Sequence, residues 1–172
     1  MAGVAVDSLL ARARLAGLRI ATAESCTGGL VAAALTGVAG ASDVFDRGFV
    51  TYSDAAKMAL LGVAPATLAR HGAVSEAVAA EMAEGALARS DAGLAVAVTG
   101  IAGPGGSAFK PEGRVCFALA GTGQLTRAET VEFGARGRAK VRAAATVHAL
   151  GLLLAALDRA AAGPPAPPTA AT

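Results

Sequence analysis

The chain has 172 residues, of which 54% are hydrophobic, so it is long enough for one domain with a buried core. Its formal net charge of +2 is too small to indicate a nucleic-acid partner, and no apolar run reaches the roughly 18 uncharged residues of a membrane span. Two distant cysteines and two histidines predict neither a disulfide framework nor a zinc site, and we expect no metal and no cofactor.

Hydrophobic periodicity predicts helices and strands in alternation over the first hundred residues. Helices are expected at residues 6–16, 27–38, 55–62, 64–72 and 74–90, and strands at 18–23, 47–53 and 93–100. The last of these strands is uncharged and rich in small residues, which is typical of a central strand buried on both faces. The first residues place an acid before their basic residues and have no long apolar stretch, so no signal peptide is expected and the protein is predicted to be cytoplasmic.

The remainder of the chain begins with a loop dense in Gly and Pro, "GIAGPGGSAFKPEGR". Two strands follow at 114–121 and 125–133, and a helix is predicted at 137–159. Because the link "GTGQ" is too short for a parallel crossover, we expect an α/β fold, a three-layer α/β/α sandwich with a mixed, mostly parallel sheet of about five strands. Residues 1–162 would form a single domain, and residues 163–172 a disordered tail rich in Pro and Ala.

Ser25 and Cys26 lie where the first strand is expected to turn into a helix. Open α/β sheets bind ligands at the carboxyl ends of their strands, and the N–H groups of the following helix can hold an oxyanion or a phosphate there. A plain helix cap by Ser25 or Thr27 explains the same residues. From this stretch alone, both a nucleophile and a cap remain open.

A second candidate is "TYSDAAK", in which Tyr52 ends a strand and Lys57 lies in the next helix. A serine hydroxyl needs a base near neutral pH, and a partly buried lysine can supply one where histidine is scarce. Tyr52 could order that lysine or pass a proton. An exposed helix lysine and an ordinary strand tyrosine are the alternative.

A third candidate is the glycine-rich stretch Thr99–Gly106, whose backbone can approach a ligand closely and form an anion-binding nest. A flexible surface loop is the alternative. The start of the last helix carries a basic cluster that could bind a phosphate or form a solvated charged face. That cluster is Arg136, Arg138, Lys140 and Arg142.

Six segments, in this order and spacing, resemble the C-terminal domain of the CinA (competence/damage-inducible) family. They are "TAESCTGG", "FDRGFVTYSDAAK", "LGV", "HGAVSE", "TGIAGPGG" and "KPEGRVCFAL". The resemblance covers about Leu9 to Leu157 and implies a metal-independent amidohydrolase that converts nicotinamide mononucleotide to nicotinate mononucleotide and ammonia. It departs from the family pattern at Gly137, where an acidic residue is usual before the arginine.

The resemblance also implies the site residues. Ser25 would be the nucleophile, completed by Tyr52 and Lys57 as the catalytic set. The substrate-binding residues expected are Cys26, Thr27, Gly28, Gly29, Thr99, Gly100, Gly103, Gly105, Gly106, Arg138 and Arg142. The partner would be a small nucleotide substrate, in a homo-oligomer, most simply a dimer. Two alternatives stay open: a nucleotide-binding module without turnover, and a cysteine amidase that uses Cys26 with His71.

Overall fold

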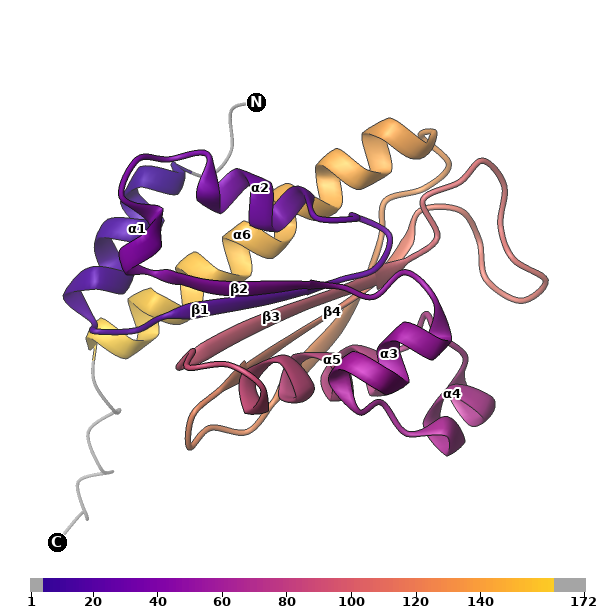
Figure 1. The fold of residues 1–172 in the computed structure, drawn as a ribbon. Helices are drawn as coiled ribbons and strands as arrows, with labels where there is room; N and C mark the ends of the chain where they lie inside the picture. The colour runs from indigo at the N-terminus through magenta and orange to yellow at the C-terminus, as the bar shows by residue number, and fades with distance from the viewer. Residues whose placement is uncertain (1–4, 163–172) are drawn as a thin grey trace, which may run out of the picture.

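The computed structural model describes residues 5–162, whose strands form one sheet in the order β2-β1-β3-β4-β5 (Figure 1). The strands are β1 (Ile20–Glu24), β2 (Phe45–Val50), β3 (Leu94–Gly100), β4 (Arg114–Gly121) and β5 (Arg127–Glu132). β1 pairs parallel with β2 and β3, whereas β4 pairs antiparallel with β3 and β5. Only β4 therefore runs against the other strands, and the predicted mixed, mostly parallel sheet is confirmed.

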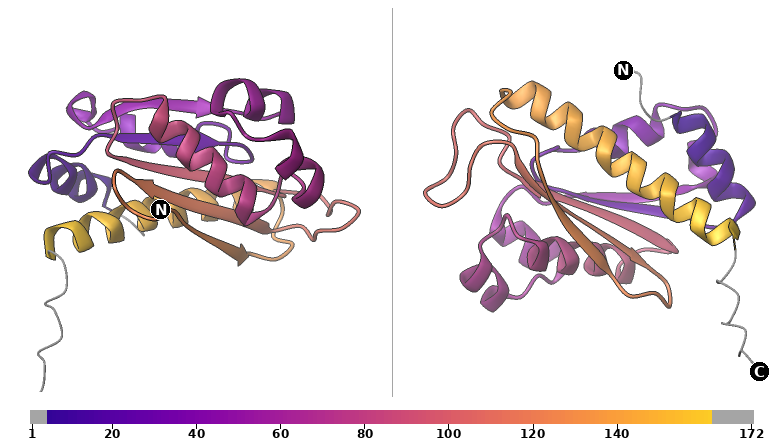
Figure 2. Two further views of the ribbon diagram at one scale, coloured as in Figure 1. Left: turned by 90° about the horizontal axis from the view of Figure 1, so that it is seen from below. Right: turned by 180° about the vertical axis from the view of Figure 1, so that it is seen from behind.

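Helices cover both faces of the sheet, so the predicted three-layer sandwich is also confirmed (Figures 1 and 2). The helices are α1 (Val6–Leu15), α2 (Leu30–Thr36), α3 (Asp54–Leu61), α4 (Pro65–His71), α5 (Glu76–Ala88) and α6 (Arg138–Ala162), with a short 3-10 turn, η1 (Ala41–Asp43). α1, α2 and α6 lie on one face, and α3, α4 and α5 lie on the other.

The two layers of helices bury two separate hydrophobic clusters, one on each face of the sheet. Leu9, Val31, Phe117 and Leu153 belong to the first, whereas Met82 belongs to the second. Successive strand residues point to opposite faces, and every residue of β1 is buried. The prediction of a small-residue central strand at 93–100 is confirmed by β3, which lies between β1 and β4.

By length and composition α6 could cross a membrane. Its side chains Val141, Ala145, Leu153 and Leu157 are nevertheless buried in the core beside the sheet. An apolar helix face is expected wherever a helix covers a sheet in this way. The helix predicted at 137–159 is confirmed by α6, whose apolar face packs against the sheet.

Several boundaries differ by a few residues from the sequence-based expectation, and two of these differences lie at the site. α2 begins at Leu30 and not at Thr27, because Gly28 and Gly29 have left-handed φ angles of 60° and 96° that cannot continue a helix. β2 ends at Val50, and Ser53, which was expected in the strand, instead caps α3 by accepting a hydrogen bond from the Ala56 amide. The expected tail at 163–172 lies outside the described residues.

Candidate active site

The carboxyl ends of β1, β2 and β3 meet at one edge of the sheet, on the right in Figure 1. Ser25 follows β1 directly, and its amide donates to the carbonyl of Val98 in β3. The amide of Thr51 donates to the carbonyl of Glu24, which attaches the end of β2 to the same point. The start of α6 and the glycine-rich loop also lie at this edge (Figure 1).

Ser25 and Lys57, 32 positions apart in the chain, are in contact at this edge. The Nζ of Lys57 lies 3.3 Å from the Oγ of Ser25 and donates to the carbonyl of Thr51 at 3.1 Å. α3 carries Lys57 inward, so that the side chain is only 1% exposed, and Ser25 is 9% exposed. The pair predicted from sequence is therefore brought together inside the protein, and Lys57 is not the exposed helix lysine of the alternative.

Burial lowers the pKa of Lys57 below its ordinary value, since desolvation disfavours the charged ammonium. The carboxylate of Asp54, 3.7 Å from Nζ, works in the opposite direction and favours the charged form. Desolvation is the larger effect. A lysine in this environment can act as a general base at lower pH than an exposed one.

Burial raises the pKa of the Cys26 thiol to about 11, so the group is a neutral thiol near pH 7. Cys26 belongs to the core cluster on the face of α1, α2 and α6. His71 ends α4 on the opposite face of the sheet. The structure does not bring the two residues of the cysteine-amidase alternative together.

The N-terminus of α2 is occupied by a side chain that the sequence analysis did not single out. The fully buried carboxylate of Glu24 accepts hydrogen bonds from the amides of Gly29 and Val31 at 3.0 Å each, and of Ala32 at 2.8 Å. Neither Ser25 nor Thr27 caps the helix, so the helix-cap alternative is wrong. An acidic residue shortly before a helix favours the helix dipole, and that signal could have identified Glu24 from sequence.

The expected substrate-binding residues Cys26, Thr27, Gly28 and Gly29 do not all have a backbone amide left for a ligand. The amide of Gly29 bonds Glu24, and the amide of Gly28 donates to the carbonyl of Ser25 at 3.0 Å. Within residues 5–162, the amides of Cys26 and Thr27 have no acceptor. Thr27 is fully buried, so Cys26, which is 5% exposed, is the one of these two that a ligand in the turn can reach.

Arg142, predicted to bind substrate, lies instead on the backbone of the turn. Its Nε donates to the carbonyl of Cys26 at 3.0 Å, and its Nη2 donates to the carbonyl of Thr27 at 2.7 Å. A Cβ at Gly28 would come within 3.3 Å of that Nη2. Gly28 is thus required for its positive φ, and a side chain there would also crowd the guanidinium.

Tyr52 and Arg138 meet at the exposed side of the site, where Arg138 donates to the Tyr52 hydroxyl and, at 3.2 Å, to the carbonyl of Gly103. Tyr52 is 58% exposed, and in the described part of the chain it makes no hydrogen bond to Ser25 or Lys57. Its participation in proton transfer stays a prediction.

The glycine-rich stretch divides into two parts. Thr99 and Gly100 still belong to β3: the Thr99 hydroxyl donates to the carbonyl of Ala73 at 2.8 Å, and Gly100 lies so close to β4 that a Cβ would come within 2.7 Å of Val115. Gly103, Gly105 and Gly106 form the protruding loop.

The protruding loop is not an empty anion nest. The carboxylate of Glu112 accepts from the amide of Gly105 at 2.7 Å and from the amide of Gly137, just before α6, at 2.9 Å. Glu112 was not singled out from sequence, because nothing in its spacing relates it to the start of α6. The basic cluster at that helix start is also divided, since Arg138 lies over the loop and Arg142 on the nucleophile turn.

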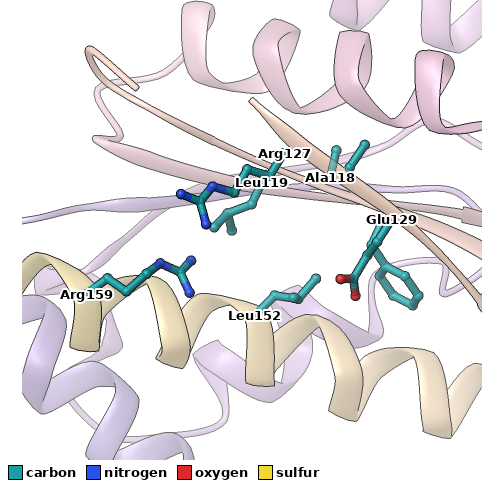
Figure 3. A pocket seen from close by; sticks show the side chains of 8 residues that line it. Ala118, Leu119, Arg127, Glu129, Leu152 and Arg159 are labelled. Carbon is teal, nitrogen blue, oxygen red and sulfur yellow. The ribbon is translucent and has the colours of Figure 1, made fainter. Parts of the chain in front are cut away.

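The structure also has two hollows that do not include the Ser25–Lys57 contact. One, of about 140 Å³, lies between β4, β5 and α6 and has Arg127 and Arg159 at its rim (Figure 3). The other, of about 540 Å³, lies between the α4–α5 connection and the loop that carries Phe109. Neither is lined by Ser25 or Lys57. No group of three or more His, Cys, Asp or Glu side chains placed to hold a metal occurs within the described range 5–162.

A model of the family described as "CinA C-terminal domain" matches residues 4–157. A protein of Enterobacter agglomerans named nicotinamide-nucleotide amidohydrolase PncC is 54% identical over 127 residues, which cover 73% of this chain and 77% of the relative. A CinA-like protein of Mycolicibacterium vanbaalenii is 52% identical over 90% of this chain. The chain spans only 36% of that relative, and about a third of several other curated relatives.

Solved structures of competence/damage inducible and CinA superfamily proteins have the same fold as this chain. The crystal structure of a competence/damage inducible protein from Agrobacterium tumefaciens superposes with a TM-score of 0.85 at 48% identity and covers 90% of this chain and 93% of that chain. A CinA superfamily protein from Escherichia coli superposes with a TM-score of 0.79 at 42% identity, covering 87% and 89%. The architecture described above is therefore shared with these proteins.

Proposed function

Because this chain belongs to the CinA C-terminal domain family, we propose that it hydrolyses the carboxamide of nicotinamide mononucleotide to give nicotinate mononucleotide and ammonia. The substrate is suggested by the name of the Enterobacter agglomerans relative, which this chain matches at 54% identity over most of both sequences. The longer CinA-like relatives carry no substrate in their names. The chemistry of the site is the independent support for the proposal.

The observation that carries the proposal is the contact between Ser25 and Lys57. The two polar atoms are 3.3 Å apart in a buried environment that lowers the pKa of the amine. A neutral amine at that distance can accept the hydroxyl proton, which turns an unreactive serine into a nucleophile. Lys57 also forms an ion pair with Asp54 at 3.7 Å, and its Nζ lies closer to the hydroxyl of Ser25 than to that carboxylate.

The reaction then runs in two steps. Lys57 accepts the Ser25 proton while Oγ forms a bond to the amide carbon, and the amide of Cys26 donates to the oxyanion. Each such donor contributes roughly 2.7–4 kcal/mol to transition-state stability. When the carbon–nitrogen bond breaks, the leaving nitrogen takes up a proton and departs as ammonia, and water hydrolyses the acyl ester on Ser25.

The exposed side of the site would bind the nucleotide. Arg138 supplies a guanidinium suited to a phosphate, and the loop at Gly103–Gly106 lies beside it. Tyr52, held by Arg138, is close enough to this entrance to contact the substrate or to pass a proton to the departing nitrogen. Since Arg142 is committed to the nucleophile turn, Arg138 is the arginine assigned to the substrate.

An ammonia assay on purified protein with nicotinamide mononucleotide tests the proposal. The wild type is expected to release ammonia, Ser25→Ala to release none above background, and Cys26→Ala to keep much of the activity. Activity in Ser25→Ala together with loss in Cys26→Ala would refute the serine mechanism. Binding of the nucleotide by the wild type without ammonia release would instead identify a binding module.

A further inference from the structure

The carboxylate of Glu112, at the end of the protruding loop, joins that loop to the start of α6 (Figure 1). Its Oε2 accepts from the amide of Gly105 at 2.7 Å, and its Oε1 accepts from the amide of Gly137 at 2.9 Å. Gly137 directly precedes Arg138, the arginine assigned to the substrate. Both oxygens of this carboxylate therefore hold backbone groups on the exposed side of the site, and the proposed reaction gives Glu112 no contact with the substrate.

We propose that Glu112 is a positioning residue that fixes Arg138 and the glycine-rich loop in the arrangement that receives the phosphate of the substrate. This inference rests on the proposed function. Arg138 itself donates to the carbonyl of Gly103 at 3.2 Å, so two charged side chains hold the loop. Glu112 accepts from an N–H of the loop, and Arg138 donates to a C=O two residues earlier. The loop cannot move relative to α6 without breaking one of these charge-assisted hydrogen bonds.

The backbone of the loop allows the carboxylate to approach. A Cβ at Gly103 would collide with the carboxylate of Glu112, and the φ angle of Gly103 is 88°. Glycine adopts this angle readily and has no Cβ to collide. In this structure Gly103, which the sequence predicted to bind substrate, is thus needed for the contact with Glu112.

The arginine that is held in this way lies at the entrance of the site. Arg138 donates to the hydroxyl of Tyr52. The carbonyl of the preceding residue, Thr51, accepts from the Nζ of Lys57. Desolvation raises the pKa of the Cys26 thiol to about 11, and the charge of Arg138 is among the smaller influences that lower it. The guanidinium is therefore near enough to the nucleophile turn to bind an anionic group of a substrate whose amide carbon is attacked there.

A double-mutant cycle between Glu112→Ala and Arg138→Gln, read by the kinetics of ammonia release, tests the proposal. In Glu112→Ala the KM for nicotinamide mononucleotide should rise by roughly 5-fold to 10-fold while kcat changes little, because a misplaced guanidinium loses part of a charged hydrogen bond to the phosphate. In the Arg138→Gln background the same substitution should have no further effect on KM. Glu112→Gln, which keeps one acceptor oxygen, should recover part of the affinity. The matched control is Glu84→Ala, an exposed residue of α5 on the other face of the sheet, which should leave kcat and KM unchanged.

Three outcomes of the cycle would overturn the proposal. A lower KM in Glu112→Ala would mean that the carboxylate competes with the phosphate for the loop. Additive effects of the two substitutions would mean that Glu112 acts independently of Arg138. An unchanged KM would mean that Arg138 needs no support from Glu112.

Two measurements that need no turnover separate this proposal from the proposed function. Hydrogen exchange at the amides of Gly105 and Gly137 should accelerate in Glu112→Ala while core amides of β3 stay protected, and unchanged exchange overturns the positioning role whatever the activity. Titration calorimetry with nicotinamide mononucleotide should give the same cycle in Kd. If the wild type binds the nucleotide but releases no ammonia, the proposed function fails while the calorimetric cycle still decides the role of Glu112. If it neither binds nor turns over the nucleotide, both proposals fail. If Glu112→Ala does not fold, Glu112→Gln carries all three measurements.

Discussion

The floor and the rim of the site differ in burial and in how their side chains are held. The floor consists of Glu24, Ser25 and Lys57, which are buried, and Arg142, which is half-buried; all four are tied to backbone groups or to each other. The rim consists of Tyr52, Arg138 and the loop at 103–112, which are half-buried or exposed.

This difference suggests a division of labour. Groups that form and break bonds must be held within a fraction of an ångström, and burial with several hydrogen bonds achieves this. Groups that select a substrate can be more exposed, since they act by contact alone. Substitutions in the floor should therefore lower kcat, whereas substitutions in the rim should raise KM. Kinetics that reversed these two patterns would remove the distinction.

The largest effect is expected for Lys57→Arg in the floor. A guanidinium stays protonated and cannot accept the Ser25 proton, so kcat should fall by about 10²-fold to 10⁴-fold, the range that a general base contributes. Steady-state ammonia release measures the loss, and circular dichroism with nucleotide binding shows that the fold and the rim persist. An active Lys57→Arg enzyme would exclude Lys57 as the base.

The next effect concerns the rim. Arg138→Gln removes a charge that can pair with a phosphate, and hydrogen bonds to charged groups contribute about 1.5–3 kcal/mol, so KM should rise by roughly 10-fold or more while kcat changes little. Tyr52→Phe removes the hydroxyl that Arg138 contacts, and a smaller rise in KM is expected. A large fall in kcat in Tyr52→Phe would place the tyrosine with the floor and support its role in proton transfer.

Sequence patterns predicted the elements better than the contacts of the floor. The strand at 114–121 and the hairpin link after it were predicted at their observed positions, because a short apolar run and a short Gly-containing link are local signals. The convergence of Ser25 with Lys57 is a property of strand order. Spacing alone left it open, and the resemblance to the family supplied it.

The roles of Glu24 and Arg142 could not be predicted in the same way. Their partners are backbone groups whose directions depend on the two left-handed glycines of the turn. Two glycines in a row where a helix is expected indicate that the backbone needs glycine at positions 28 and 29. They do not indicate which side chain approaches the turn. A charged residue that the sequence predicts to bind a ligand can therefore form its hydrogen bonds within the protein, as Arg142 does with the carbonyl of Cys26.

A smaller effect is expected for a substitution of Asp54, an exposed residue whose carboxylate lies 3.7 Å from the buried Nζ of Lys57 in the floor. Its carboxylate, 58% exposed, favours the charged form of Lys57 and so opposes the lowering of the pKa by burial. Asp54→Asn removes that opposition and lowers the pKa of Lys57 further. Since the reaction needs the neutral amine, the rise of kcat/KM with pH should move to lower pH. A pH–rate profile measures the shift, and a shift to higher pH would contradict the base assignment.

The smallest effect is expected at Cys26, a floor neighbour with no assigned side-chain chemistry. Only the thiolate reacts with iodoacetamide, and burial raises the pKa of this thiol to about 11. Near pH 7.5 the folded protein should therefore stay unmodified at Cys26 and keep its activity, whereas the denatured chain should react readily. Mass spectrometry of the labelled peptide across a pH series measures this, with Cys26→Ala as the control for background labelling. Fast labelling near neutral pH, accompanied by loss of activity, would mean that Cys26 is accessible to solvent beside Ser25. The contrast between a buried floor and an exposed rim would then not hold.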